Sequence, residues 1–188
     1  MFGFSIVKFI NNGVWYIYYM RWILYLIVLL FLVACTTDKV ENEVISMKLK
    51  SNDFNEGEMI PSKFTCQGED INPQLSWEDV PAGVKSFALV FDDPDAPMGT
   101  WVHWLVKEIP SSVREINQNS VPGNEVVNSF GKEGYGGPCP PSGVHRYFFK
   151  LYALDVESFE ASGKADFYKK VEEHMIAKAE LVGKYIKS

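Results

Sequence analysis

The chain has 188 residues, of which 47% are hydrophobic and 22% are charged, and this composition excludes an intrinsically disordered protein. Its length fits a single domain. Its formal net charge of −6 provides no basic surface for a phosphate backbone, so nucleic acid is excluded as an expected partner.

The N-terminal region has the pattern of an export signal. Arg21 precedes an apolar run over residues 22–34, and Cys35 directly follows the small residue Ala34. The run is shorter than the roughly 20 residues that span a bilayer. A cysteine at this position resembles a bacterial lipobox, in which the cysteine is lipidated and becomes the mature N-terminus. We therefore expect a signal peptide over residues 1–34 and a lipid on Cys35.

A transmembrane anchor that begins near Val14 is the alternative, because residues 14–34 are mostly apolar. Arg21 in the middle of such a span would cost about 2.5–3.5 kcal/mol, which favours the signal peptide. Met20, directly before Arg21, is the better start for such a signal. We expect translation to begin there and the protein to be exported and lipid-anchored to the bacterial cell envelope, in the periplasm or at the cell surface.

The remainder of the chain is more acidic than the whole. Residues 1–34 contain two basic and no acidic side chains, which leaves 16 basic and 24 acidic side chains and a net charge of −8. Residues 35–46 are mostly polar and are expected to tether a domain that spans residues 47–188. We find no internal repeat and no second change of composition, so we expect one domain.

Two cysteines remain once Cys35 is assigned to lipid. Cys66 and Cys139 can form a disulfide, because an exported protein meets an oxidising environment. Two free thiols are the alternative, and the spacing of the cysteines does not decide between them.

Three apolar runs predict β-strands: residues 86–91, 102–109 and 147–154. Clusters of Gly, Pro, Asn and Asp separate them and are typical of turns. Several strands without alternating helices predict a mainly β protein, an antiparallel β-sandwich.

The C-terminal segment predicts a helix. Asp166 can serve as its N-cap, and apolar residues recur every three to four positions from Phe167 to Ile186. We expect this helix to pack on a face or an edge of the sandwich. His174 lies beside the apolar stripe and is expected to be a surface or boundary residue, not a ligand-binding one.

The first stretch with residues suited to a binding site is Asp92-Asp93-Pro94-Asp95-Ala96-Pro97, which follows a buried strand. Its two prolines fix φ and remove two backbone donors, so the segment is rigid and cannot continue a ladder. Taken alone, it is typical of a turn that ends a strand.

The second stretch is Trp101-Val102-His103-Trp104. Strand alternation places Trp101 and His103 on one face, with Val102 and Trp104 on the other. An indole beside an imidazole suits the wall of a pocket. A histidine buried in the core with satisfied hydrogen bonds is the competing interpretation.

The third stretch runs from Gly136 through Pro138 to Tyr147. Alternation places His145 and Tyr147 on one face and Arg146 on the opposite one. The preceding glycines can bring backbone N–H groups close to an anion. The loop is not a nucleotide-binding Walker loop, because no Gly-Lys-Ser/Thr follows it.

Together these stretches offer two imidazoles, a phenol, a carboxylate, an indole and glycine amides, which suit a small anionic or zwitterionic group. The sequence has no metalloprotease helix motif and no nucleophile elbow. We therefore expect no cofactor.

The motifs resemble, in their order, those of the phosphatidylethanolamine-binding protein family: DPDAP at 93–97, WVH at 101–103 and GPCPPSGVHRY at 137–147. TCQGEDINPQLSW at 65–77 is similar to the bacterial branch, often labelled Raf kinase inhibitor-like. The resemblance covers about residues 45–186 and implies an antiparallel β-sandwich with peripheral helices. Cys66 and Cys139 depart from the pattern of animal members. Kinase binding, known for those members, is not implied for an exported bacterial protein.

The resemblance also implies a small cavity for phosphate or phosphoethanolamine-like groups. Carried over by motif, its residues are Asp93, Pro97, Trp101, His103, Gly137, Pro138, His145 and Tyr147. The carboxylate of Asp93 would repel a phosphate. We expect it to orient a histidine and keep it cationic, or to pair with the ammonium of an ethanolamine group.

We weigh three functions, of which the third comes from the family resemblance alone. We expect a membrane-tethered, non-enzymatic protein that binds a phosphate-bearing small molecule or a phospholipid head group and modulates a protein partner. The alternative is a phosphoester hydrolase, in which Asp93, His103 and His145 hold a metal or act as acid and base. Protease inhibition has precedent in the family and is the third.

The lipid on Cys35 can be tested directly. Cells that express the wild-type protein or Cys35→Ala are grown with a clickable fatty-acid analogue, and labelling of the protein is compared. We expect label on the wild type alone, because the thiol is the site of attachment. Equal labelling of both proteins, or of neither, contradicts the lipoprotein interpretation.

Overall fold

The computed structural model describes residues 47–187. The expected signal peptide, the lipid site at Cys35 and the whole of the tether lie outside the described residues. Within the described residues, no helix is long and apolar enough to span a membrane.

The described chain is built mainly from β-strands. In order, its elements are β1 (Lys48–Lys50), the 3₁₀ turn η1 (Ser62–Phe64), β2 (Leu75–Glu78), β3 (Ser86–Asp93), β4 (Trp101–Pro110), β5 (Glu115–Ile116), β6 (Asn124–Glu125), β7 (Val144–Leu154), α2 (Lys164–His174) and β8 (Met175–Ile186). The three strands expected from the apolar runs are present as β3, β4 and β7, each somewhat longer than predicted.

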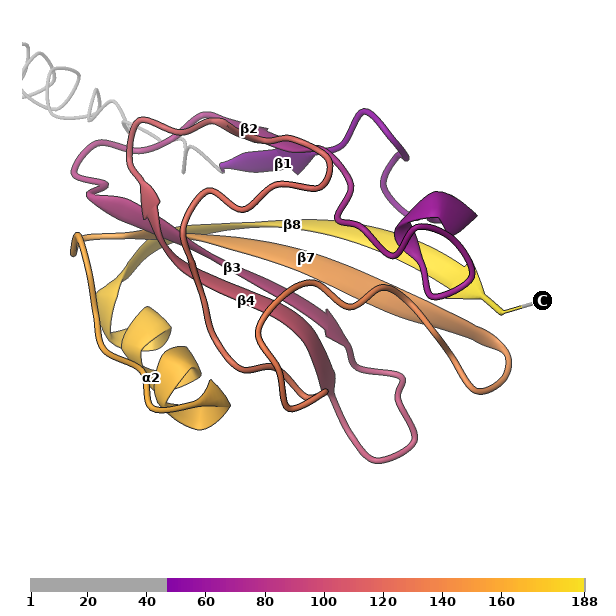
Figure 1. Cartoon of the computed structure of the whole chain (residues 1–188). Helices are drawn as coiled ribbons and strands as arrows, with labels where there is room; N and C mark the ends of the chain where they lie inside the picture. The colour runs from indigo at the N-terminus through magenta and orange to yellow at the C-terminus, as the bar shows by residue number, and fades with distance from the viewer. Residues whose placement is uncertain (1–46, 188) are drawn as a thin grey trace, which may run out of the picture. The chain divides into compact units, whose positions relative to one another are not determined.

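The strands form two antiparallel sheets. One has the order β1-β2-β5 and the other the order β6-β4-β3-β7-β8. In Figure 1 the strands β1 and β2 lie over one face of the larger sheet, and α2 lies against the opposite face. The mainly β, antiparallel sandwich with a peripheral helix is therefore confirmed.

Strand β3 lies at the centre of the larger sheet and is buried on both faces. Phe87, Leu89 and Phe91 point into the core between the two sheets, whereas Ala88 and Val90 point into the core beneath α2. A strand covered on both faces needs no polar side chains, which explains its continuous apolar sequence.

The expected C-terminal helix is wrong beyond His174. There α2 ends, and β8 pairs antiparallel with β7 along nearly its whole length. The residues of β8 that point into the core alternate: Ala179, Leu181, Gly183 and Tyr185. Two of these residues are small, so the apolar alternation typical of a strand is weak in the sequence. The helix-forming Ala, Lys and Glu residues, together with apolar residues three to four positions apart, favoured a helix instead. Pairing with β7 overrides that local preference.

Gly183 was the available signal against a continuous helix, because glycine is unfavourable in the interior of a helix. A Cβ atom at this position would lie 2.4 Å from Cγ1 of Ile60. The glycine lets the segment at residue 60 pass close over β8, where the Ile60 N–H donates to the Lys184 carbonyl at 2.8 Å.

The start of α2 also differs from the prediction. Gly163 is the N-cap, and Asp166 lies in the first turn, where its carboxylate accepts the Ser162 N–H at 3.0 Å and so has a lowered pKa. A carboxylate in the first turn also interacts favourably with the helix dipole. His174 is a partly exposed residue, as expected, and its Nδ1 lies 2.9 Å from Asp155 Oδ1.

A buried ion pair lies between the larger sheet and α2. Oδ2 of the buried Asp92 accepts a hydrogen bond from Lys150 Nζ at 2.7 Å and one from the Tyr168 hydroxyl at 3.4 Å. Its Oδ1 has no hydrogen-bond partner among the described residues. Burial raises the pKa of Asp92, and the contact with Lys150 opposes that shift. The carboxylate therefore depends on Lys150 for its charge.

We expect Lys150→Met to lower the free energy of unfolding by about 3–5 kcal/mol, because it leaves the buried carboxylate of Asp92 without a counter-ion. Urea denaturation measures the change. The matched control is Lys50→Met, whose partner Glu78 lies 2.6 Å away with both side chains about half exposed, at 56% and 49%. Loss of that pair should cost less than about 1 kcal/mol. Equal losses in the two variants would contradict this account.

Candidate functional site

Three strand ends meet at one end of the larger sheet. Because β3 runs antiparallel to both of its neighbours, its last residues lie beside the first residues of β4 and β7. A pocket of about 240 Å³ opens there. Its lining residues are Asp93, Ala96, Pro97, Trp101, His103, Phe130, Cys139, Pro141, His145 and Tyr147. Of the residues expected from the motifs, Gly137 and Pro138 do not line the pocket.

A β-bulge places His103 in the pocket. Phe91 pairs with Trp104 and the next residue, Asp92, pairs with Val102, so His103 has no partner in β3. The expectation that Val102 and Trp104 share a face is wrong, because they lie in the two different cores. A bulge interrupts strand alternation and redirects side chains, and bulges are common beside functional sites.

The start of β7 follows the expected alternation. His145 and Tyr147 are buried and face the pocket, whereas Arg146 is exposed on the other side of the strand. Unlike β4, this strand is in regular register at this point, where it pairs with β8. Simple alternation was therefore sufficient to predict its inward residues.

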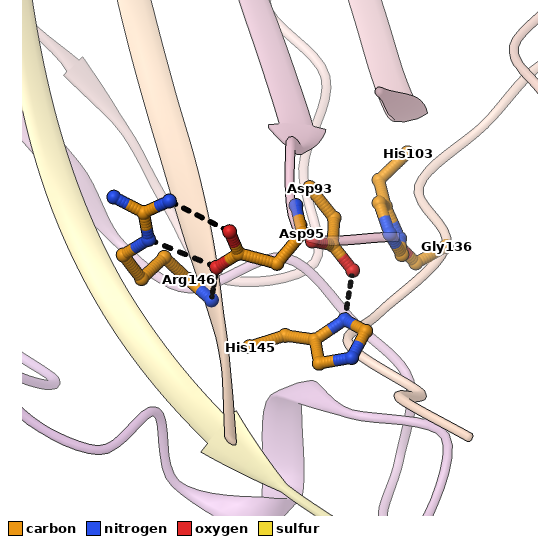
Figure 2. A network of polar contacts seen from close by, with 6 residues as sticks. All are labelled: Asp93, Asp95, His103, Gly136, His145 and Arg146. Atoms are coloured by element: carbon orange, nitrogen blue, oxygen red, sulfur yellow. Dashed lines mark hydrogen bonds and ion pairs between the residues drawn. The ribbon is translucent and has the colours of Figure 1, made fainter. Parts of the chain in front are cut away.

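Asp93 and His145 form a buried pair, shown in Figure 2. Nδ1 of His145 lies 2.7 Å from Asp93 Oδ2. A carboxylate accepts hydrogen bonds, so Nδ1 carries the hydrogen and donates it. Oδ1 of Asp93 accepts the Asp95 N–H at 2.8 Å, which fixes the carboxylate in turn. Nε2 of His145 is thus left for the pocket.

A second carboxylate ties the β3–β4 loop to β7. Asp95 accepts hydrogen bonds from Arg146 Nε at 2.9 Å, Nη2 at 2.6 Å and the backbone N–H at 3.0 Å (Figure 2). The guanidinium lowers the pKa of Asp95 to about 2. Since Arg146 adjoins His145 and Asp95 lies just after Asp93, this bidentate contact holds the end of β3 that carries Asp93 against the strand that carries its partner.

His103 is oriented by the backbone. Its Nδ1 lies 2.7 Å from the carbonyl oxygen of Gly136, which can only accept, so Nδ1 carries a hydrogen here as well. Burial lowers the pKa of His103, and the Gly136 carbonyl and the charge of Asp93 partly oppose this. His103 is therefore mainly neutral near pH 7, with a lone pair on Nε2.

The Tyr147 hydroxyl is buried and has no hydrogen-bond partner among the described residues. Burial, and next the nearby charge of Asp93, raise the pKa of Tyr147, so the hydroxyl keeps its proton. The ring lies against both imidazoles, with centroids 5.4 Å from His103 and 6.5 Å from His145. Buried polar groups without a partner are rare in folded proteins, and this one is a donor that a ligand could satisfy.

The pocket has no permanent positive charge, because none of the described residues that line it is Lys or Arg. Positive charge there must come from protonated histidine. Within residues 47–187, no group of three or more His, Cys, Asp or Glu side chains is placed to hold a metal ion. The hypothetical metal site of Asp93, His103 and His145 is thus not formed, since Asp93 and His145 bind each other.

Gly137 does not present its amide to the pocket as expected. Its N–H donates to Oδ1 of Asp70 at 2.6 Å. A Cβ atom at this position would lie 2.5 Å from the Phe64 carbonyl oxygen. Gly137 is therefore needed for close packing of the pocket wall against residues 64–70.

Cys66 and Cys139 form a disulfide, with Cα atoms 5.5 Å apart. The Cys66 N–H also donates to the Pro138 carbonyl at 3.2 Å. Cys139 lines the pocket, so the bond attaches one pocket wall to the segment that follows η1.

Phe130 is the lining residue that sequence reasoning missed most clearly. Its ring centroid lies 5.3 Å from that of His103 and 5.4 Å from that of Trp101, although it comes from a loop without a motif. Nothing in the neighbouring sequence predicts this contact. The loop is placed by Asn128, whose Nδ2 donates to the carbonyls of His103 and Gly134.

The fold and the pocket define a β-sandwich domain with a small polar site at one end of its larger sheet. A family model described as phosphatidylethanolamine-binding protein matches residues 50–186. The chain belongs to the phosphatidylethanolamine-binding protein family.

Relatives and solved structures agree with this membership. A UPF0098 protein of Aquifex aeolicus is 47% identical over 150 residues, which cover 74% of this chain and 88% of the relative. A phosphatidylethanolamine-binding protein homologue from Chlamydia trachomatis superposes with a TM-score of 0.73 at 39% identity, over 77% of this chain and 99% of that one. YbcL of Escherichia coli, described as a new member of the mammalian family, has a TM-score of 0.71 at 33% identity, over 76% and 99%.

We expect the double variant Cys66→Ser/Cys139→Ser to lose about 4 kcal/mol of unfolding free energy, because the disulfide closes a loop with a sequence separation of 73. Urea denaturation without reductant measures the loss. Cys35→Ser, which leaves the pair intact, is the control. Unchanged stability, or two thiols that react with an alkylating agent in the untreated native protein, would contradict the structural role of this bond.

Proposed function

We propose that the domain is a non-enzymatic binding protein whose pocket takes a small phosphate-bearing group, such as phosphoethanolamine or a phospholipid head group. The observation that carries this proposal is the convergence of two buried imidazoles and an unpartnered tyrosine hydroxyl on one pocket of about 240 Å³. That volume is below the roughly 300–1,000 Å³ of sites for drug-sized ligands, so it suits a head group and not a whole lipid.

The donors for an anion would be Nε2 of His103, Nε2 of His145 and the Tyr147 hydroxyl. Each imidazole already donates from Nδ1, to Gly136 and Asp93 respectively. Either ring can therefore donate to a phosphate oxygen only when it is protonated on both nitrogens. Such a charge-assisted hydrogen bond is roughly twice as strong as a neutral one. Binding of the anion would thus be coupled to uptake of protons.

Asp93 has a place in this mechanism although its charge repels a phosphate. Its oxygen lies 2.7 Å from Nδ1 of His145 and fixes the orientation of the ring. The carboxylate would thus aim the outward nitrogen of His145 at the anion. For a zwitterionic ligand, Asp93 also supplies the negative charge that an ammonium group prefers.

We propose in addition that a lipid on Cys35 tethers the domain to the bacterial cell envelope, where it would modulate a protein partner. The support is the basic residue, apolar run and small residue that precede Cys35 in the sequence. A tether of this kind would confine the pocket near a surface rich in phosphate-bearing head groups.

Phosphoester hydrolysis remains the second candidate, because the Asp93–His145 pair has the geometry of an oriented general base. The described residues that line the pocket include no Ser or Thr, and the Cys139 thiol is held in the disulfide. A covalent mechanism would thus lack a serine, threonine or cysteine nucleophile, which favours binding without chemistry. Turnover of a phosphoester that disappears in His145→Ala would establish the enzymatic function instead.

We expect phosphoethanolamine to bind more weakly as the pH rises through the range in which histidine titrates, near about 6.5 for the unperturbed side chain, because deprotonation removes the Nε2 donors. Isothermal titration calorimetry across pH measures this dependence. Replacing His103 or His145 with Ala should cost about 1.5–3 kcal/mol of binding free energy. His174→Ala, which removes a partly exposed histidine outside the pocket, is the matched control and should bind as the wild type does. An affinity for phosphoethanolamine that neither His103→Ala nor His145→Ala changes would refute the assignment of these histidines as donors.

A further inference from the structure

A single peptide unit connects Asp70 with His103. The carbonyl of Gly136 and the N–H of Gly137 belong to the same planar peptide group. That N–H donates to Asp70 Oδ1 at 2.6 Å, and that carbonyl accepts from Nδ1 of His103 at 2.7 Å. A carboxylate and an imidazole are therefore joined by two short hydrogen bonds through one peptide.

We propose that Asp70 is a positioning residue for the pocket: acting through this peptide, it holds His103 in the Nδ1–H tautomer and makes Nε2 a stronger proton acceptor. The inference rests on the proposed function, in which a protonated His103 holds the anion. Hydrogen bonds in a chain polarise one another. A carboxylate on the N–H side increases the negative charge on the carbonyl oxygen, which stabilises positive charge on the ring.

Both imidazoles of the pocket are then supported by a carboxylate. Asp93 contacts His145 directly, whereas Asp70 acts on His103 through the peptide. Asp70 is exposed, so its Coulomb interaction with His103 through solvent is screened. The hydrogen-bonded peptide gives it a second route, besides the Coulomb interaction that also favours the protonated ring.

The contact between Asp70 and Gly137 is held in place by its surroundings. Asp70 has a φ of 55°, in the left-handed region that Asp and Asn adopt more readily than most residues. Its N–H and that of Glu69 both donate to the Lys63 carbonyl, at 3.2 and 2.9 Å. A Cβ atom on Gly137 would lie 2.6 Å from Asp70 Oδ1 and 2.7 Å from the Thr65 Cα. A side chain at Gly137 would therefore displace the peptide.

The other ionisable groups around His103 come from several elements. Asp93 lies at the end of β3, while His145 and Tyr147 line the same pocket from β7. The charges of Asp93 and Asp70 both favour the protonated ring, whereas burial lowers the pKa of His103. Burial also raises the pKa of Tyr147, which keeps that group neutral. Removal of the Asp70 charge should therefore make His103 harder to protonate.

The test is a pH titration of the ligand-free protein by long-range ¹H–¹⁵N NMR, which reports the tautomer and protonation of each of the three histidines. Asp70→Asn keeps an oxygen that accepts the Gly137 N–H and tolerates the left-handed backbone, but it loses the charge. We expect it to retain the Nδ1–H tautomer and to lower the proton-binding constant of His103 about threefold to tenfold. Asp70→Ala should in addition allow His103 to leave the Nδ1–H tautomer.

Glu56→Gln is the matched control, because Glu56 also accepts a backbone N–H, from Val182 at 2.8 Å, and carries the same charge. It should leave His103 unchanged. An identical tautomer and titration of His103 in the wild type and both Asp70 variants would overturn the proposal. Titrations of the same proteins with phosphoethanolamine distinguish failure of the role proposed for Asp70 from failure of the proposed function. If the His103 titration changes but the wild type binds no ligand, the pocket function fails and the role of Asp70 stands.

Discussion

Both imidazoles of the pocket donate from Nδ1 to a fixed acceptor, a carboxylate for His145 and a peptide carbonyl for His103. This constraint decides what the pocket can do. It fixes the orientation of each ring and leaves Nε2 as the only free ring nitrogen. It also makes the hydrogen bonding of the pocket depend on protonation of its histidines. A neutral ring of this tautomer offers a lone pair on Nε2, whereas a charged ring offers a hydrogen. With no Lys or Arg among the described lining residues, the positive charge of the pocket comes from its histidines.

The rest of the fold serves to hold these acceptors in place. Antiparallel pairing brings the end of β3 beside the starts of β4 and β7, and the Asp95–Arg146 contact secures the loop that directly follows Asp93. The disulfide and the packing around Gly137 secure the wall that bears the Gly136 carbonyl. Rigid support of this kind is what a small binding site needs, since errors of about 0.5 Å weaken directional contacts.

Much of the fold and of the site could be predicted from the sequence where the pattern was local. The apolar runs of β3, β4 and β7 and the alternation of His145 and Tyr147 required only neighbouring residues. Features that depend on partners distant in sequence could not be read in the same way. The bulge at His103 and the pairing of β8 with β7 are set by register, and the Gly137 amide is taken by a carboxylate 67 residues away. Phe130 lies in a loop without any regular pattern.

The most direct test of this account is the number of protons taken up when phosphoethanolamine binds. Calorimetric titrations at pH 7.5 in buffers of different ionisation enthalpy give that number from the slope of binding enthalpy against buffer enthalpy. The account predicts net uptake, because His103 is mainly neutral at this pH and must gain a proton on Nε2 to hold the anion. Binding with no net uptake of protons would contradict it.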